Sequence, residues 1–337
     1  MSDAHPPRIP PSDTAVSGSG PEPPSSVQDW FNLSAVAEVA PRPFDDGDVI
    51  ESPPLVAGYA ILDRLGRGRV GQVYKAQSAN SDRAVALKVI RTPGGPAPEG
   101  LVRLRQSLSA AARLGHPDIV QIFEVGERPG LLYIAQEFLP GGTLAAAVGR
   151  MPQAPEFAAD LIETAARAVQ AAHDAGVIHA GLSPQNILLD GVGRPRLTDF
   201  GLTTPEVADR SPISSCYRAP EQVGSTSGPV GRAADVYALG VILYELLTGR
   251  PPFLGAAAHK TVEYIRHHEP VAPQLLVPDL PIDLGDICLT CLRKNPAERY
   301  PGAKDLADDV RRFRRGEPIQ SRQTSWTAKL SRKLLGH

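Results

Sequence analysis

The feature that most constrains the fold is a change in hydrophobic pattern near position 140. Between 58 and 138, five short runs rich in Val, Ile, Tyr and Phe alternate with Gly, Pro, Asn and Asp, which is typical of strands joined by turns. One segment between the third and fourth runs, 99–114, instead carries apolar residues at helical spacing. Beyond 140 the pattern predicts amphipathic helices over 157–172, 234–247, 284–294 and 303–314. We therefore expect a small strand-rich half followed by a larger helical half.

The two ends of the chain have a different composition. Eleven of the 34 prolines lie between 1 and 55, together with many Ser, Asp and Glu residues, so we expect this segment to be disordered. We interpret an apolar island around Trp30 as stray apolar residues in this disordered stretch, with a docking helix as the alternative. Residues 319–337 form a short basic amphipathic tail, either a frayed terminal helix or a segment that contacts an anionic membrane surface.

Composition excludes several classes of function. The net charge of −2 gives no reason to expect a nucleic-acid partner. The longest apolar run, 236–247, is interrupted by Glu245 and is shorter than the roughly 20 residues of a membrane span. The chain starts without a signal peptide, and its three cysteines cannot form a disulfide framework, so we expect a cytoplasmic protein. Cys288 and Cys291 fall inside a predicted helix and are expected to be buried in its packing.

A glycine motif indicates a phosphate site. Gly66, Gly68 and Gly71 are followed by Val73 in a G-x-G-x-x-G-x-V pattern, which lies between two predicted strands. A dinucleotide-binding turn would lead into a helix, so the strand that follows favours a glycine hairpin over phosphates. Fifteen residues after Val73, Lys88 ends the sequence V-A-L-K on another strand, where its ammonium group could bind phosphate.

Three further motifs follow in order. Residues 179–186 read H-A-G-L-S-P-Q-N, 198–201 read T-D-F-G, and 219–221 read A-P-E. With the glycine motif and V-A-L-K, this order resembles a bacterial Ser/Thr protein kinase domain over residues 58–318. The resemblance implies an α+β bilobal fold. Its N-lobe (56–139) would be a small antiparallel sheet with one helix, and its C-lobe (140–318) would be larger and helical, with ATP bound between them.

The resemblance also implies a role for individual residues. The three glycines would cover the phosphates, Lys88 would contact the α- and β-phosphates, and Asn186 with Asp199 would hold Mg²⁺. Gln136 would be the gatekeeper beside the adenine pocket. The adenine would be bound by a set of mostly apolar residues: Val73, Ala86, Glu137, Leu139 and Leu188. Two structural contacts are expected as well, a stack of His179 on Phe200 and a buried ion pair of Glu221 with Arg299.

The sequence departs from the kinase pattern at the positions that carry the chemistry. Gly181 stands where the catalytic Asp belongs, and loss of a positioned base costs about 10²–10⁴-fold in rate. Ser183 replaces a lysine that would meet the γ-phosphate. Counting back from the Leu-Gly-His-Pro turn places Ser107 where a glutamate would pair with Lys88, and no acidic residue occurs between 100 and 117. Ala180 replaces the arginine that would bind a phosphorylated loop.

Three functions are compatible with this pattern. We predict a pseudokinase that binds Mg-ATP and acts as a signalling regulator or scaffold with protein partners that the sequence does not identify. The first alternative is an active Ser/Thr kinase with low or atypical activity, which would need a base other than Asp190 or Asp199. The second is a scaffold that does not bind nucleotide, which leaves Asn186 and Asp199 unexplained.

Overall fold

The computed structural model describes residues 56–67, 71–79, 81, 83–92, 99–202, 212–223 and 230–321. These residues all belong to one compact unit, Asp45–His337. The predicted disordered segment 1–55, the island around Trp30, Gly68 and residues 322–337 of the predicted tail lie outside the described residues.

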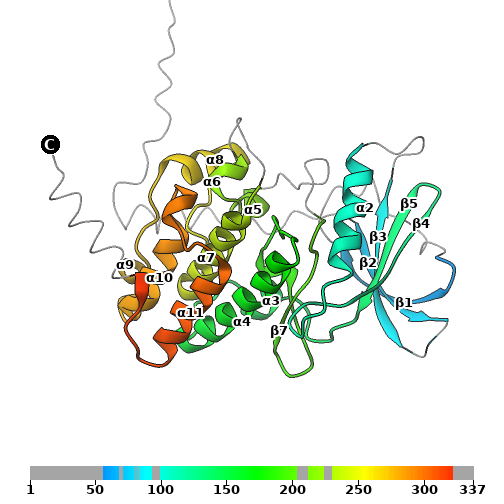
Figure 1. The fold of residues 1–337 in the computed structure, drawn as a ribbon, viewed down its shortest axis with the longest axis horizontal. Coiled ribbons are helices and arrows are strands. Elements are labelled where there is room, and N and C mark those ends of the chain that lie inside the picture. The colour runs from blue at the N-terminus through cyan, green and yellow to red at the C-terminus, as the bar shows by residue number, and fades with distance from the viewer. Residues whose placement is uncertain are drawn as a thin grey trace, which may run out of the picture. The chain divides into compact units, whose positions relative to one another are not determined.

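The first lobe is a five-stranded antiparallel sheet with one helix, coloured blue to green in Figure 1. Its strands have the order β1-β2-β3-β5-β4. In chain order the elements are β1 (Tyr59–Arg67), β2 (Gln72–Ser78), β3 (Ala84–Arg91), α2 (Glu99–Ala111), β4 (Ile122–Arg128) and β5 (Leu131–Glu137). Each predicted strand is present, and the predicted helix 99–114 ends three residues early.

The sheet buries both of its faces because side chains alternate along each strand. One face gathers Tyr74 of β2, Leu87 of β3 and Tyr133 of β5 into one cluster. The opposite face packs Ile134 of β5 against α2, whose buried residues include Leu108. Central strand β3 is therefore buried over six successive residues, which explains its unbroken apolar sequence.

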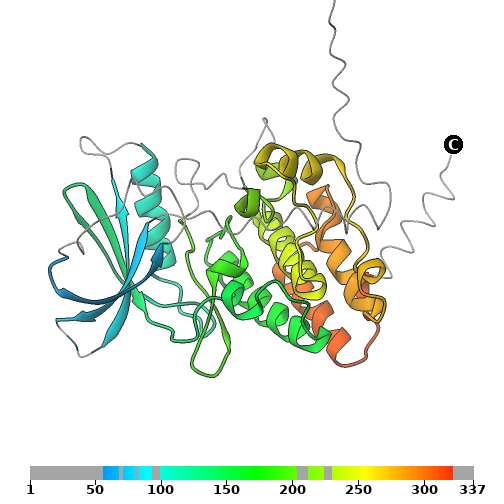
Figure 2. The same ribbon diagram turned by 180° about the vertical axis from the view of Figure 1, so that it is seen from behind.

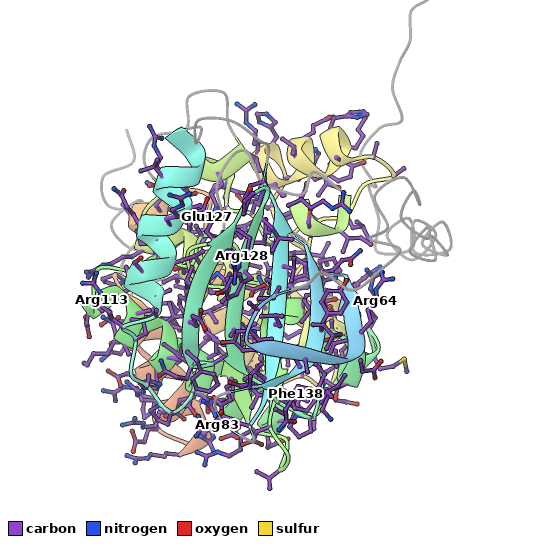
Figure 3. All side chains as sticks on the ribbon, turned by 90° about the vertical axis from the view of Figure 1, so that its right-hand side faces the viewer. Arg64, Arg83, Arg113, Glu127, Arg128 and Phe138 are labelled. Atoms are coloured by element: carbon purple, nitrogen blue, oxygen red, sulfur yellow. The ribbon has the colours of Figure 1, made fainter. Side chains whose placement is uncertain are left out.

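Charged side chains lie on the two edge strands. Arg64 of β1 and Glu127 and Arg128 of β4 are exposed, and Figure 3 shows Arg64 on the opposite side of the sheet from Glu127. Arg105 of α2 forms an ion pair with Glu127. Charged edges are a common means by which sheets avoid pairing with another chain.

The second lobe is built from helices and one short hairpin. Its principal helices are α4 (Pro155–Asp174), α7 (Arg232–Thr248), α10 (Ile282–Cys291) and α11 (Ala303–Arg314), which confirm the four predicted helices. The remaining elements are short: α3 (Leu144–Val148), η2 (Pro184–Asn186), β6 (Ile187–Leu189), β7 (Pro195–Leu197), α5 (Pro212–Ser215), α6 (Pro220–Val223), α8 (Ala258–His267), α9 (Pro273–Leu276) and η3 (Pro296–Glu298).

Helix α7 is the centre of this lobe, with α4 and α10 packed on it (Figure 2). It contains the apolar run of the sequence and is buried from Ala234 to Leu247, so the prediction of a buried helix is confirmed. Gly240 lets α10 approach closely, because a Cβ there would lie 2.4 Å from the Cβ of Cys291. Cys288 and Cys291 are free and buried in α10, as expected. No helix among the described residues is long and apolar enough to cross a membrane.

The two lobes are joined by more than the chain crossing at 138–143. The turn after α2 pairs with β7, since Leu197 N–H donates to the Asp118 carbonyl at 2.8 Å and Val120 N–H donates to the Leu197 carbonyl at 2.8 Å. Arg196 of β7 donates to the Ile119 carbonyl at 3.0 Å and to a carboxylate oxygen of Glu137 at 2.8 Å. The end of β5 is thereby held in place above the second lobe.

Candidate nucleotide site and catalytic loop

The glycine motif spans the connection from β1 to β2, and its last glycine, Gly71, lies close to β3. Gly71 is required there, because a Cβ at this position would lie 2.0 Å from the Val89 carbonyl oxygen. Val73 pairs with Lys88 in the β2–β3 register, and Ala86 pairs with Gln136 in the β3–β5 register. Gly66 ends β1 beside this hairpin, while Gly68 lies outside the described part of the chain.

Lys88 points into the interior between the lobes. Its side chain is 5% exposed, and its Nζ lies 2.5 Å from Oδ2 of Asp199, whose side chain is 11% exposed. Asp199 has a left-handed backbone with φ of 70°, which costs a non-glycine residue about 1–2 kcal/mol. The predicted phosphate-binding lysine and the predicted metal ligand are therefore in direct contact.

The two predicted metal ligands are brought together by the backbone. Thr198 N–H donates to the Asn186 carbonyl at 3.0 Å, which places Asp199 next to Asn186. The Asn186 side-chain nitrogen donates to the Gly181 carbonyl at 2.8 Å, so its side-chain oxygen is available as a ligand. A carboxylate and an amide oxygen are the donors that Mg²⁺ prefers, and this pair fits such an ion. If Mg-ATP binds, the ion would neutralise phosphate charge.

Asp235 holds the backbone of the catalytic loop. Its carboxylate accepts hydrogen bonds from the His179 N–H at 2.9 Å and the Ala180 N–H at 2.8 Å, and it lies 2.8 Å from Nε2 of His173. Ala180 has a left-handed backbone with φ of 58°. The Gln222 side chain adds a 2.8 Å bond to the Ala180 carbonyl. The sequence motifs gave Asp235 no role, although a charged residue in the first turn of an apolar helix was a usable signal.

The loop carries no acid at the position of the base. Gly181 has no side chain, and Ser183 lies just before η2. The next acidic residue after Gly181 along the chain, Asp190, belongs to the turn between β6 and β7. Its Oδ1 accepts the Arg194 N–H at 2.8 Å and the Val192 N–H at 2.9 Å. These backbone bonds lower the pKa of Asp190, so it stays an anion engaged in its own turn.

Helix α2 approaches the metal-ligand segment through small residues. A Cβ added to Gly201 would lie 2.9 Å from the Cβ of Ser107, so Ser107 is the residue of α2 that abuts this segment. Leu202 follows, buried in the same cluster as Leu104 and Leu108 of α2. The position that the kinase pattern assigns to a glutamate is therefore next to Gly201, two residues from Asp199.

The back of the site is polar and hydrogen-bonded. Gln136 is buried, and its side-chain nitrogen lies 3.2 Å from the Thr198 hydroxyl. His179 stacks on Phe200 with 4.6 Å between ring centroids, as the kinase resemblance implied. The His179 ring also lies 3.0 Å from the Thr198 carbonyl through Nε2. Thr198 thus links the gatekeeper position to the catalytic loop, a role that sequence analysis missed.

The predicted adenine pocket lies where the lobes meet. Leu188 lies on β6, and Leu139 follows β5 in the crossing between the lobes. Leu65, which sequence analysis did not name, is 44% exposed at the end of β1 directly before Gly66. Its position directly before the glycine motif is a signal by which Leu65 could have been singled out from the sequence. The Glu137 carboxylate is paired with Arg196, so only its backbone is left to face a ligand.

The ion pair expected in the lower lobe is present. Arg299 binds both carboxylate oxygens of Glu221, at 2.7 and 2.8 Å. Its guanidinium also donates to the carbonyls of Arg293, Lys294 and Ala233, and its side chain is 0% exposed. A buried cation bonded this completely is a structural anchor, and it holds the A-P-E segment on α7.

Comparison with known proteins was made on the sequence and on the fold. The family model for the protein kinase domain matches residues 59–309. The Serine/threonine-protein kinase PknB of Mycobacterium leprae (strain TN) is 32% identical over 284 residues, which cover 80% of this chain and 45% of that protein. PrkC of Bacillus subtilis (strain 168), also named a serine/threonine-protein kinase, is 33% identical over 261 residues, which cover 75% of this chain and 40% of that protein. The chain spans less than half the length of these two relatives.

Solved structures give the same result for the fold. A crystal structure of the Mycobacterium tuberculosis PknI kinase domain, in a mutant form, superposes with a TM-score of 0.63 at 27% sequence identity. The match covers 78% of this chain and 98% of that one. The predicted bilobal fold, a sheet-rich N-lobe followed by a helical C-lobe, is confirmed.

Proposed function

Because the chain belongs to the protein kinase domain family, we propose that it is a pseudokinase that binds Mg-ATP and has lost efficient phosphoryl transfer. One observation carries this proposal. The side chains of Asp235 and Asn186 hold the backbone of the catalytic loop by three hydrogen bonds, of 2.9, 2.8 and 2.8 Å. The residue at the position of the base in this loop is Gly181, which has no carboxylate. If the loop were displaced, another acidic side chain could occupy the position of the base. Because this loop is held in place, the base is missing from that position.

The retained groups support nucleotide binding. Lys88, Asp199 and Asn186 converge between the lobes, and Gly71 keeps the glycine hairpin close to β3. Such groups can position Mg-ATP, while a rate comparable to that of a kinase also requires a base for the incoming hydroxyl. We propose a regulatory or scaffolding role toward protein partners in the cytoplasm, a location that the three buried cysteines, none of them in a disulfide, support.

Thermal unfolding with Mg-ATP tests the binding half of the proposal. Nucleotide at 100 times its Kd should raise the free energy of unfolding by about 2.7 kcal/mol, which appears as a higher Tm. A matched titration with Mg²⁺ and adenine alone controls for non-specific effects. An unchanged Tm at millimolar Mg-ATP would instead favour a scaffold that binds no nucleotide.

Labelled ATP tests the catalytic half. We expect no autophosphorylation and no transfer to a generic Ser/Thr substrate above the level of an Asp199→Ala control. Transfer that disappears in this control would establish the alternative, a kinase of low activity. The two measurements are independent, because binding is read from unfolding and chemistry from the transferred phosphate.

A further inference from the structure

The charge on Lys88 needs a counter-ion inside the protein. Its side chain is 5% exposed, and a buried ammonium group without a partner is strongly destabilising. Asp199 is the one acidic side chain recorded within ion-pair distance of Lys88 in the part of the chain that the structure describes. Lys88 thus depends on the same carboxylate that the kinase resemblance assigns to the metal.

Helix α2 cannot supply a substitute. Ser107 is the residue that abuts Gly201, and serine carries no charge. Apart from Glu99 at its first residue, α2 has no aspartate or glutamate, and none occurs between 100 and 117, so a small rotation or slide of α2 around Ser107 brings no carboxylate to Lys88. The contacts of Leu104 and Leu108 with Leu202 hold α2 against this segment by apolar packing, which does not require a charge pair.

We propose that Asp199 has two successive roles, as the counter-ion of Lys88 in the empty site and as the Mg²⁺ ligand in the loaded site. This inference rests on the proposed nucleotide binding. Mg²⁺ alone would take Asp199 and leave Lys88 unpaired. Nucleotide alone would place phosphate beside the Asp199 carboxylate. When Mg²⁺ and nucleotide bind together, each of the two residues gains a new partner: the phosphate replaces Asp199 beside Lys88, and the metal replaces Lys88 beside Asp199.

The consequence is strong coupling between metal and nucleotide. Each ligand should raise the affinity of the other by the same factor, because binding free energies are reciprocal. Coupling of this kind amounts to about 5–150-fold, and we place this site at the upper end because both charges are buried. A carboxylate at position 107 would lower the factor, since Lys88 would keep a partner after Asp199 had moved to the metal.

The counter-ion role is tested without any ligand. Asp199→Asn should lower the Tm by about 10 °C, because it strands the Lys88 charge. Adding Ser107→Glu to this variant should recover at least half of the loss, whereas Ser107→Gln, of nearly the same size and without charge, should not. If Asp199→Asn alone does not fold, recovery of folded protein on addition of Ser107→Glu, and not of Ser107→Gln, would support the counter-ion role equally. Equal behaviour of the Glu and Gln variants would overturn the proposal.

The coupling is tested by calorimetric titration of the full chain with Mg²⁺ alone, with ATP in EDTA, and with Mg-ATP. In the wild type, Mg²⁺ should raise the affinity for ATP by at least about 50-fold. In Ser107→Glu this factor should be about tenfold smaller, and in Ser107→Gln it should equal that of the wild type. An equal factor in all three proteins contradicts the proposal. If no protein bound nucleotide in any of the titrations, the proposed nucleotide binding would be refuted. The counter-ion role of Asp199 would still be decided by the Tm measurements, which need no ligand.

Discussion

At the scale of single residues, the site combines intact positioning with missing chemistry. Asp235 fixes the amides of His179 and Ala180, and Asn186 fixes the carbonyl of Gly181, as a working loop would require. Under the proposed function, Gly181, Ser183 and Ser107 stand where the kinase pattern has a base, a phosphate clamp and a counter-ion. These losses are chemically distinct, so repair of one does not repair the others.

Gly181→Asp alone should therefore not restore strong kinase activity. A base contributes about 10²–10⁴-fold only when the phosphates are clamped and oriented around it. The triple variant Gly181→Asp, Ser183→Lys, Ser107→Glu should exceed the single variant by at least about tenfold in transfer of labelled phosphate. Robust substrate phosphorylation by Gly181→Asp alone would show that positions 183 and 107 matter little.

At the scale of elements, close helix contacts depend on small residues. Gly240 on α7 faces Cys291 on α10 at a point where an added Cβ would be 2.4 Å from another Cβ. Gly285 on α10 differs, because the atoms nearest to an added Cβ belong to the end of the Gln274 side chain, at 1.8 to 2.8 Å. A flexible amide can move aside, and a packed helix cannot.

The same substitution at these two helical glycines should affect stability to different extents. Gly240→Ala should lower the free energy of unfolding by about 1–3 kcal/mol through overpacking. Gly285→Ala should be near neutral, because the gain of up to about 1 kcal/mol in helix propensity offsets the displacement of Gln274. Chemical denaturation of both variants checks the difference, and comparable losses in stability would contradict this account of the α7–α10 contact.

At the scale of the whole molecule, one lysine links folding to pH. Lys294 lies over the Phe253 ring, with its Nζ 3.9 Å from the ring centroid, and donates to the Ile265 carbonyl at 2.7 Å. Burial lowers the pKa of Lys294 to about 8. In the unfolded chain its ordinary pKa is about 10.4. Between these values the unfolded state binds more protons, so this group makes folding more favourable as pH rises.

Lys294→Met provides the comparison. The stability of the wild type relative to this variant should increase as pH rises from about 8 to about 10.4 and stay constant below pH 7. Urea denaturation of both proteins across this range isolates the effect from other titrating groups, which the two proteins share. A difference that does not change with pH would mean that the Lys294 charge is not penalised in the folded protein.

The sequence by itself determined the order of elements, the pairing of a sheet-rich lobe with a helical one, and the motif positions at which this chain differs from the kinase pattern. Local signals suffice there, since periodicity marks each element and the five motifs are contiguous. The boundary of α2 was misjudged by three residues because helix ends depend on tertiary contacts.

Only the tertiary structure decided which distant residues meet. It placed Asp199 on Lys88, 111 positions away, and Asp235 on a loop 55 positions upstream. Contacts of this kind follow from the packing of whole elements, and no local pattern encodes them. The sequence thus showed which charges are missing, and the fold showed how the remaining charges are paired.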